Sequence, residues 1–421
     1  MRVLTVNCYF PMYSTGKLIK ALEDELSQQD VEFFHCYEAG EKYAGSNALR
    51  LSGWFEYRVY YYMARITGNR YGTGVFSTKR LLNKIAKWQP DVVHIHCPNA
   101  SSVNLYQLLD YLKKNDIPTV ITHHAEFFYT GNCPHAYECK GYMEGCLKCP
   151  DFHQATESYF INRTKTSWKK MKEVMDGAKF VSVCVSKWQA ERCRNSVICG
   201  GLETHQVGNG IDTENTFFYK EDSKLENKFC PNGEKIVLHV TAQFTDDANS
   251  NKGGAEILKL AKMYENDRNV KFIVIGRYYL SQDNLISKNI TFLGEVKDQD
   301  MLSKFYSLAD VTVITSKRET FGLVCAESLC CGTPVVGYKC GGMETIAIDE
   351  YTDFVSWGDV EKLYASICEI LNRNVNKKDI SHEAKTRYSM KEMARRYIKI
   401  YDEVINIKKE EDIVCKKLLQ D

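Results

Sequence analysis

The chain has 421 residues, which is long for one domain and suggests two. Hydrophobic residues make up 44% of it, and the formal net charge is +1. The composition is therefore that of a globular protein, and no overall basic field points to nucleic acid.

No apolar run approaches the roughly 18 residues that a membrane-spanning helix needs. The first residues pass directly into a strand-like run, without the apolar core and cleavage site of a signal peptide. Seventeen cysteines are spread over both halves, which suits reduced thiols better than a disulfide framework. We expect a cytoplasmic protein, with peripheral contact to the inner face of the cell membrane left open.

Short apolar runs alternate with segments of helical period along the whole chain. Continuous Val and Ile runs indicate strands covered on both faces, as in a parallel sheet, so the predicted class is α/β. The expected strands are Val3–Val6, Val31–Phe34, Val92–Ile95, Thr119–Ile121, Phe180–Val183, Ile236–Val240, Phe272–Ile275, Ile290–Leu293, Val311–Ile314 and Pro334–Gly337. The expected helices include Lys17–Gln28, Thr78–Trp88, Ser102–Lys114, Ala255–Glu265 and Asp300–Leu308.

The strand pattern restarts near Ile236, after a polar stretch from 203 to 234. We predict two doubly wound, Rossmann-like domains at 1–205 and 206–388, followed by a terminal segment 389–421. In such folds ligands bind beyond the carboxyl ends of the strands, so an interdomain cleft is the expected site.

The loop after the first strand ends in Gly16-Lys17. A Walker A phosphate loop is excluded, because Pro11 stands where the first glycine belongs and Leu18 replaces the Ser or Thr. A plain turn is the alternative to a ligand-binding loop.

Residues 54–65 mix aromatic side chains with arginines, and the basic pairs at 79–80 and 169–170 belong to the same half. Two interpretations stay open. The segment is either a face that meets an anionic membrane and a lipid-linked acceptor, or a helix packed on the sheet with its arginines solvated.

Four cysteines, Cys133, Cys139, Cys146 and Cys149, lie in a polar, glycine-containing loop. Thiols this dense in a cytosolic loop favour a metal over disulfides, and four thiolates favour structural Zn²⁺. Only the last pair has common zinc-knuckle spacing. Free thiols or a reducible disulfide remain alternatives, with His135 as a substitute ligand.

Ser316–Glu327 is the most informative stretch. Glu319 and Glu327 stand eight positions apart, after an apolar strand and before Gly332-Thr333-Pro334. The phrase resembles the E-x7-E signature of retaining nucleotide-sugar glycosyltransferases of family 4, which have the GT-B fold. The N–H groups of Phe321, Gly322 and Leu323 are expected at a helix start that attracts phosphate.

Further segments continue the resemblance, toward the colanic-acid or exopolysaccharide-type branch of that family. They are 70–85, Pro90–His96, Thr122–His124 and Phe127–Cys133. Val207–Asp212 resembles a motif of the family as a whole, at the link between the two domains. His124 holds the position of a histidine that hydrogen-bonds the donor sugar, although Ala125 replaces the family's neighbouring Asp. His94 and His96 are expected only to cap a buried strand.

The resemblance also implies donor-binding roles. Gly16 would let its loop close over the sugar diphosphate, Lys252 would grip the diphosphate, and Val296 lies in the segment that edges the nucleobase. Gln243 replaces the arginine usual in the family, and Arg277 is a candidate substitute.

Two glutamates complete the implied site. Glu319 would accept a hydrogen bond from a donor-sugar hydroxyl, and Glu327 from the ribose hydroxyls. Retention is expected by front-face attack, with the donor phosphate taking the acceptor proton, and Glu319 as a nucleophile is the alternative.

Met390–Ile405 carries an apolar stripe at helical spacing, and Ser389 with Glu392 forms a capping box. The residues alone indicate an ordinary surface helix, whereas the resemblance implies a crossover to the first domain. The tail Lys408–Asp421 is expected to fray.

The implied function is retaining transfer from a nucleotide-diphosphate sugar to a lipid-linked or oligosaccharide acceptor in cell-surface exopolysaccharide synthesis. UDP-sugars are favoured, GDP-sugars come next, and no catalytic cofactor is expected. Two alternatives remain: a non-catalytic GT-B subunit that partners an active glycosyltransferase, and a nucleotide-sugar epimerase or phosphorylase.

Overall fold

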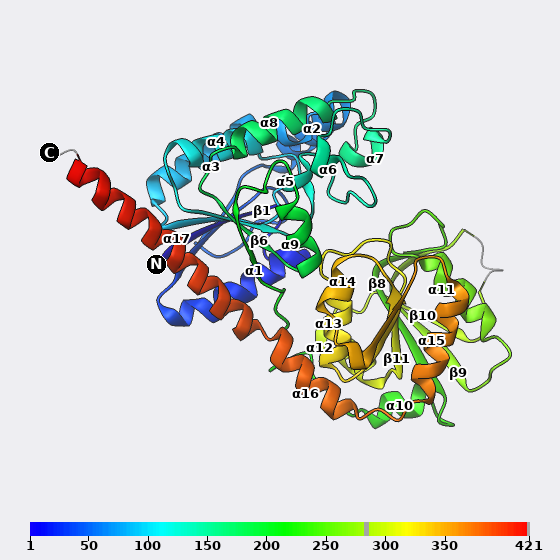
Figure 1. Ribbon diagram of the computed structural model, residues 1–421. Coiled ribbons are helices and arrows are strands. Elements are labelled where there is room, and N and C mark those ends of the chain that lie inside the picture. The colour runs from blue at the N-terminus through cyan, green and yellow to red at the C-terminus, as the bar shows by residue number, and fades with distance from the viewer. Residues whose placement is uncertain (282–285, 419–421) are drawn as a thin grey trace. The chain divides into compact units, whose positions relative to one another are not determined.

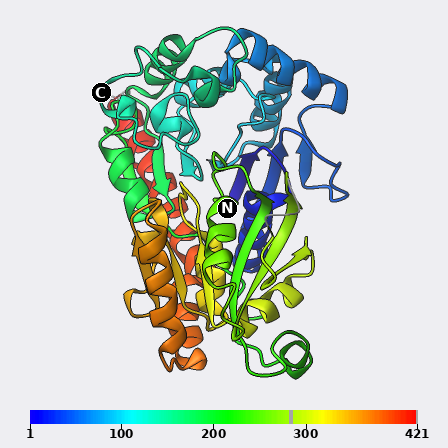
Figure 2. The same ribbon diagram turned by 90° about the vertical axis from the view of Figure 1, so that its right-hand side faces the viewer.

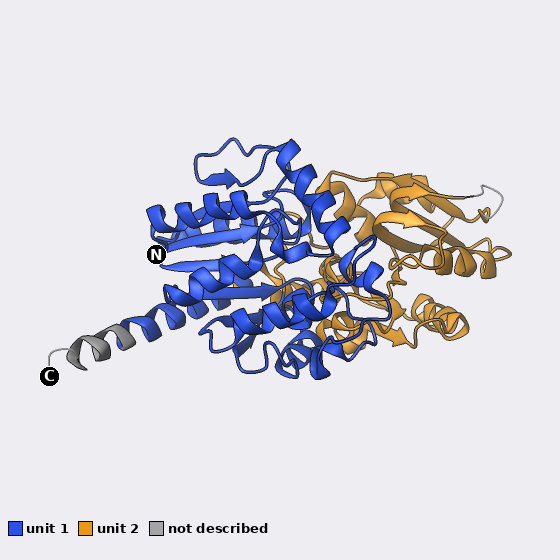
Figure 3. Cartoon of the chain, turned by 90° about the horizontal axis from the view of Figure 1, so that it is seen from above, with its two compact units in different colours: residues 1–208, 393–421 blue, residues 209–392 orange. Residues whose placement is uncertain are grey.

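The computed structural model describes residues 1–281 and 286–418, with 411–418 described by their backbone alone. Residues 419–421, the end of the predicted tail, lie outside the described residues. The chain divides into two compact units (Figure 3): residues 1–208 with 393–421, and residues 209–392. Each unit is built on its own sheet.

The described part of the first unit contains a seven-stranded sheet in which every pairing is parallel. Its central strands are apolar on both faces, so helices cover both sides. In spatial order the strands are β3 (Ala48–Arg50), β2 (Glu32–Tyr37), β1 (Arg2–Asn7), β4 (Val92–Ile95), β5 (Thr119–His123), β6 (Val181–Cys184) and β7 (Glu203–Gln206).

Helices α3, α4 and α8 lie over one face of this sheet, and α1 and α17 over the other (Figure 1). The helices of the unit are α1 (Tyr13–Leu26), α2 (Trp54–Thr67), α3 (Val75–Trp88), α4 (Leu105–Lys114), α5 (Phe127–Thr130), α6 (Gly141–Glu144), α7 (Phe152–Thr156), α8 (Thr164–Met175) and α9 (Lys187–Arg194). The last helix, α17 (Met390–Leu418), joins them from Met393 onward.

The second unit repeats the plan with six parallel strands among its described residues. They are β10 (Ile290–Gly294), β9 (Val270–Tyr279), β8 (Lys235–Thr245), β11 (Val311–Ile314), β12 (Val335–Tyr338) and β13 (Thr352–Val355). The helices are α10 (Ser223–Phe229), α11 (Gly254–Met263), α12 (Gln299–Leu308), α13 (Leu323–Cys330), α14 (Gly342–Ile346), α15 (Val360–Asn372) and α16 (Lys377–Tyr388). Figure 2 shows the parallel run of these strands from the side.

Three strands were missed by the search for apolar runs: β3, β7 and β13. All three lie at sheet edges and have half-exposed or exposed side chains. An edge strand pairs on one side only and need not be apolar. The polar stretch from 203 to 234, where the two domains were predicted to join, begins with β7 and contains α10.

Two strands of the second unit run past their predicted ends. After Val240 and Ile275 the pair β8–β9 continues through a bulge to Thr245 and Tyr279. The extension mixes buried and exposed positions and includes the exposed polar residues Gln243 and Arg277, so a search for continuous apolar runs cannot find it. Among the described helices, none combines the length and the apolar composition that crossing a membrane requires.

Candidate active site

The loop after β11 is held from two sides by the second unit's backbone. On one side Lys317 N–H donates to the Asn251 carbonyl at 2.8 Å, and the Thr315 hydroxyl donates to the Gly253 carbonyl at 2.9 Å. On the other side Glu319 N–H donates to the Cys340 carbonyl at 3.1 Å, and the Glu319 carbonyl accepts from Gly342 N–H at 2.8 Å. Glu319 is therefore fixed at the carboxyl edge of the second sheet.

Lys252 lies beside Glu319. Its Nζ is 2.7 Å from Glu319 Oε1, and the two side chains are 41% and 21% exposed. The close approach depends on Gly253, which has φ +64° and whose missing Cβ would stand 2.1 Å from the Thr315 carbonyl oxygen. The predicted diphosphate cation and the predicted sugar-binding carboxylate are thus brought together.

Glu327 lies one helix turn into α13, and its Oε2 accepts a hydrogen bond of 2.9 Å from the Tyr306 hydroxyl. Tyr306 is fully buried, and its pKa is raised by burial and then by Glu327. Gly322, with φ +96°, makes the turn into α13, and Phe321 before it is buried. The N–H groups of this turn lie at the start of α13, where anions are favoured.

The structure brings a cation next to Gln243, the residue that replaces the family arginine. Gln243 and Arg277 are cross-strand neighbours in the extended part of β8 and β9. Arg277 Nε lies 3.4 Å from a Glu295 carboxylate oxygen in a pair that solvent reaches. Val296 follows, half-buried, just after the end of β10. Arg277 can therefore supply positive charge at this edge of the sheet.

In the first unit a row of histidines ends β4 and β5. His124 Nε2 is 3.1 Å from His96 Nδ1, and the His96 ring lies 3.8 Å from the His94 ring between centroids. His94 shares hydrogen bonds with Tyr401 of α17 (2.6 Å) and with Thr122 (2.7 Å). His94 and His96 were expected to cap a buried strand, and His96 in addition contacts the predicted site histidine.

Helix α17 closes this network. The Tyr397 hydroxyl lies 2.9 Å from Thr122 Oγ1, so two tyrosines one turn apart bond to the strand ends. Sequence analysis assigned no role in the site to His96, Tyr397 or Tyr401. A signal for His96 existed, since His94 and His96 alternate along a strand and must share a face.

The histidines of this row are neutral. Burial and then His123 lower the pKa of His124 to about 3, and burial also holds the pKa values of His94 and His96 well below their usual range. A neutral imidazole can donate one hydrogen bond and accept another. His124 belongs to the first unit and Glu319 to the second, so each site half is described within its own unit.

Gly16 does not lie in the loop where it was predicted. Helix α1 begins at Tyr13, four residues before the predicted start, so Gly16 falls in its first turn. A Cβ there would stand 2.8 Å from the Tyr9 carbonyl oxygen. A glycine is therefore needed for the loop to pack on its own helix. This steric requirement explains Gly16 without a bound ligand.

A cavity of about 350 Å³ opens beside this loop, at the carboxyl ends of β1 and β2. Aromatic rings dominate its wall, together with Glu41 and the Ser52 hydroxyl. The lining residues are Tyr9, Met12, Tyr13, Ala39, Gly40, Glu41, Ser52, Gly53, Trp54 and Tyr57.

Comparisons with known proteins agree with this architecture. Residues 16–215 match a family model described as Glycosyltransferase Family 4, and residues 225–391 match one described as Glycosyl transferases group 1. Together these stretches hold the histidine row and the Lys252–Glu319 pair.

Both units of this chain are glycosyltransferase domains, and the fold is GT-B.

Solved structures similar to this GT-B chain include the sucrose-phosphate synthase of Thermosynechococcus elongatus. It has a TM-score of 0.70 at 17% identity, with 96% of this chain and 99% of that chain covered. The Anabaena protein HepE, solved with UDP, has a TM-score of 0.62 at 14% identity, with 96% and 100% covered. These likenesses show the fold.

A sequence relative is the sulfoquinovosyl transferase SQD2 of Arabidopsis thaliana, 23% identical over 363 residues, which are 81% of this chain and 61% of that protein. The chain spans 45%, 16% and 61% of the first three curated relatives that it matches.

We expect the stability of the first unit to fall as the pH drops from about 6.5 toward 4. The unfolded histidines bind protons below about pH 6.5, whereas folded His124 does so only near pH 3, so His124 alone costs about 2 kcal/mol by pH 5, and the lowered pKa values of His94 and His96 act in the same direction. Glu38 acts oppositely, because burial raises its pKa to about 7 despite three backbone N–H bonds. Three histidines lose stability as the pH falls and one carboxyl gains it, so we expect the unit to lose stability overall.

Denaturant unfolding at pH 7 and pH 5 measures this effect. The variant His96→Gln should show a smaller loss between the two pH values than the unaltered chain. The control His205→Gln, on edge strand β7, should keep the full loss. Equal stability of the unaltered chain at both pH values would contradict the histidine assignment.

Beside His124, Ala125 is followed by Glu126, which is fully buried. Its carboxylate lies 2.8 Å from Arg192 Nη2 and accepts a hydrogen bond of 3.0 Å from Ala136 N–H. The residue next to the replaced family Asp therefore fixes the start of the cysteine loop to α9.

The loop cysteines are partly gathered. Burial raises the pKa of Cys133 to about 12 and that of Cys146 to about 11, and neighbouring loop thiols add to both shifts. Among the described residues, donors within 4.8 Å of one another form two other groups, His123–Cys184–Cys193 and Glu203–His205–Glu403. The donor set suits zinc, but the four sulfurs do not form a closed site.

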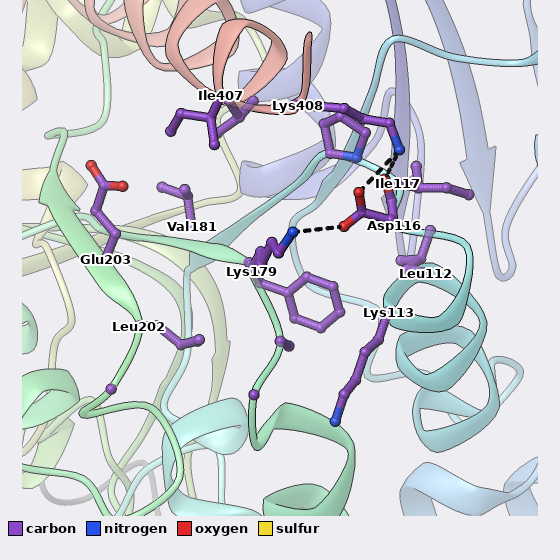
Figure 4. A pocket seen from close by; sticks show the side chains of 16 residues that line it. Leu112, Lys113, Asp116, Ile117, Lys179, Val181, Leu202, Glu203, Ile407 and Lys408 are labelled. Atoms are coloured by element: carbon purple, nitrogen blue, oxygen red, sulfur yellow. Dashed lines mark hydrogen bonds and ion pairs between the residues drawn. The ribbon is translucent and has the colours of Figure 1, made fainter. Parts of the chain in front are cut away.

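A second cavity, of about 400 Å³, lies at the opposite edge of the first sheet, where β5, β6 and β7 begin (Figure 4). Asp116 there pairs with Lys179 at 3.6 Å and with Lys408 of α17 at 3.3 Å. Ligands of doubly wound folds bind at the carboxyl edge, so this cavity is not the candidate site.

Proposed function

We propose that the chain is a retaining glycosyltransferase that moves a sugar from a nucleotide-diphosphate donor to a saccharide acceptor. The observation that carries the proposal is the Lys252–Glu319 contact of 2.7 Å at the start of α13. It joins a diphosphate-binding cation to a hydrogen-bond acceptor for the transferred sugar. The two glycosyltransferase family matches support the same assignment.

The chemistry needs two things from these residues. The departing nucleotide diphosphate gains negative charge, which Lys252 and the N–H groups at Phe321–Leu323 neutralise. The sugar must be held by its hydroxyls while the anomeric carbon becomes cation-like, which is the role of Glu319. Glu327, oriented by Tyr306, takes the ribose hydroxyls.

For the first unit we assign His124, backed by His96, to a hydrogen bond with the donor sugar. The aromatic cavity at Tyr9, Trp54 and Tyr57 offers apolar ring faces and a few polar groups, which is the usual lining of a small-molecule site. We assign the acceptor to it.

UDP is the favoured donor base, and GDP is next. The solved HepE protein is in complex with UDP, which supports the choice by fold likeness. A lipid-linked or oligosaccharide acceptor, used on the cytoplasmic side in exopolysaccharide synthesis, fits the branch that the sequence resembles.

Release of nucleotide from a panel of UDP-, GDP- and ADP-sugars, with and without saccharide acceptors, tests the proposal. One nucleotide class should be released, and faster with acceptor. Binding of a donor without any turnover would favour the alternative, a non-catalytic GT-B subunit, for which Ala125 and Gln243 are the motivation. Conversion of a donor into its epimer without release of nucleotide would favour an epimerase, and cleavage of a glycan by inorganic phosphate would favour a phosphorylase.

We further propose that Cys133, Cys139, Cys146 and Cys149 hold a structural zinc ion, which would fold a polar loop that lacks its own core. The proximity of these thiols, each close enough to act electrostatically on its neighbours, supports it. Metal analysis of protein purified without chelator should find one zinc per chain, lost in Cys139→Ser. Protein that is folded and free of zinc would refute the site.

A further inference from the structure

Helix α2 exposes a hydrophobic face to solvent, which is unusual for a surface helix. Only Tyr60 and Ala64 are buried, and the exposed positions are 54, 55, 58, 59, 62, 63 and 66. All of them except Arg58 are hydrophobic, with Trp54 73% and Phe55 75% exposed. An ordinary amphipathic helix turns its polar side to water, so this helix presents an unpartnered apolar face.

Two neighbouring segments extend that face. Val75 and Phe76 are exposed at the start of α3, which is tied to α2 by the Arg80–Glu56 ion pair. The exposed run Tyr159–Ile161 is pinned to the end of α2, because Tyr159 N–H donates to the Arg65 carbonyl at 2.7 Å. We call the exposed apolar side chains of these three segments the apolar platform.

Exposed hydrophobic side chains are concentrated on the platform. It holds eleven of the twenty exposed large hydrophobic side chains in the described part of the chain. Single exposed hydrophobic residues are normal, whereas contiguous ones mark a binding surface.

The surroundings of the platform are basic. Residues 53–80 and 157–170 contain nine Lys or Arg and two acidic residues, in a chain whose net charge is only +1. Both acidic side chains are engaged: Glu56 pairs with Arg80, and Glu157 pairs with Arg65 and Arg70. A binding partner that matches this face therefore has negatively charged groups at its surface and an apolar layer below them.

We propose that the apolar platform binds the surface of an anionic lipid bilayer, with α2 lying flat in the headgroup region. Helices of this type bury an apolar face with Trp and Phe at the headgroup boundary, while basic residues contact anionic lipids. At 14 residues α2 is too short to span the membrane. Trp54 also lines the aromatic cavity, so the proposed acceptor site would open at the membrane surface.

Vesicle sedimentation of the full-length chain tests the proposal. We expect binding to vesicles of phosphatidylcholine with phosphatidylglycerol, and at least tenfold weaker binding to phosphatidylcholine alone or in high salt. The triple variant Phe55→Ser, Phe76→Ser, Phe160→Ser takes one exposed phenylalanine from each segment. It should lose at least tenfold in vesicle affinity, because each removed ring forfeits its burial in lipid.

The matched control is the triple variant Tyr278→Ser, Tyr279→Ser, Trp357→Ser, which removes exposed aromatic residues from the second unit. It should bind vesicles as the unaltered chain does. Charge reversal by Lys79→Glu with Arg163→Glu should weaken binding to anionic vesicles about tenfold or more.

Three outcomes would overturn the proposal: no vesicle binding, equal binding by the phenylalanine variant, or a lipid-independent dimer that this variant dissociates. The last would identify the platform as a protein interface. Nucleotide release from a donor sugar is measured separately, without vesicles. Failure of the sugar transfer and failure of membrane binding are therefore distinguishable.

Discussion

Replacing Glu319 by Gln should lower the turnover of sugar transfer by about 10²–10³, while the donor still binds. Gln keeps the size of the side chain but loses the charge that faces Lys252 at 2.7 Å. It also weakens the hydrogen bond that we propose Glu319 accepts from a donor-sugar hydroxyl. The lost interaction forms most strongly as the sugar becomes cation-like, so kcat should fall much more than the donor KM rises. Steady-state kinetics with the best donor of the panel measures both constants.

The control for this variant is Glu265→Gln, which breaks the surface ion pair with Lys262 and should keep full turnover. Lys252→Met should raise the donor KM because the diphosphate loses its cation. The double variant should lose less than the two single losses combined, since both single changes break one shared contact. Turnover of Glu319→Gln within a factor of two of the unaltered chain would remove Glu319 from the mechanism.

Arg192→Met should destabilise the first unit by about 3–5 kcal/mol, because it leaves the fully buried Glu126 carboxylate without its ion-pair partner. In a unit of this size each kcal/mol lowers the melting temperature by about 2–4 °C, so the first unit should melt roughly 6–20 °C lower. Scanning calorimetry measures the shift, and the melting of the second unit should change little.

The double variant Glu126→Gln with Arg192→Met separates the charge from the packing. Removing both charges leaves no buried unpaired ion, so the double variant should be more stable than Arg192→Met alone. A single variant that melts within about a degree of the unaltered chain would show that Glu126 is solvated or protonated and that the pair does not hold the cysteine loop.

The central strands of both sheets could be read from the sequence, because a strand buried on both faces must be apolar along its length. Val3–Val6 and Val311–Ile314 are examples, and both were found. The edge strands β3, β7 and β13 could not be found this way, since one of their sides faces solvent. The early start of α1 was also missed, and because of it Gly16 lies in the helix and not in the loop that was predicted to bind ligand.

The platform on α2 is also a case in which the sequence supplied part of the answer and the structure supplied the rest. The sequence shows the aromatic residues and arginines at 54–65, but it left open whether they meet a membrane or pack on the sheet. Only burial decided that Tyr60 and Ala64 face the core while Trp54 and Phe55 face outward. The sequence period is the same in both cases, because it does not say which side of a helix the protein covers.

By itself the sequence predicted the donor half of the site, because a strand, a glycine turn and a helix place Glu319 and Glu327 within one short segment. Lys252, 67 positions before Glu319, was supplied by resemblance, and its 2.7 Å contact required the sheet order that sets β8 beside β11. The histidine row required still more, since Tyr397 and Tyr401 lie about 300 residues from His94 and Thr122 along the chain. Contacts at such separation depend on how α17 packs on the strand ends, and no local pattern of residues encodes that packing.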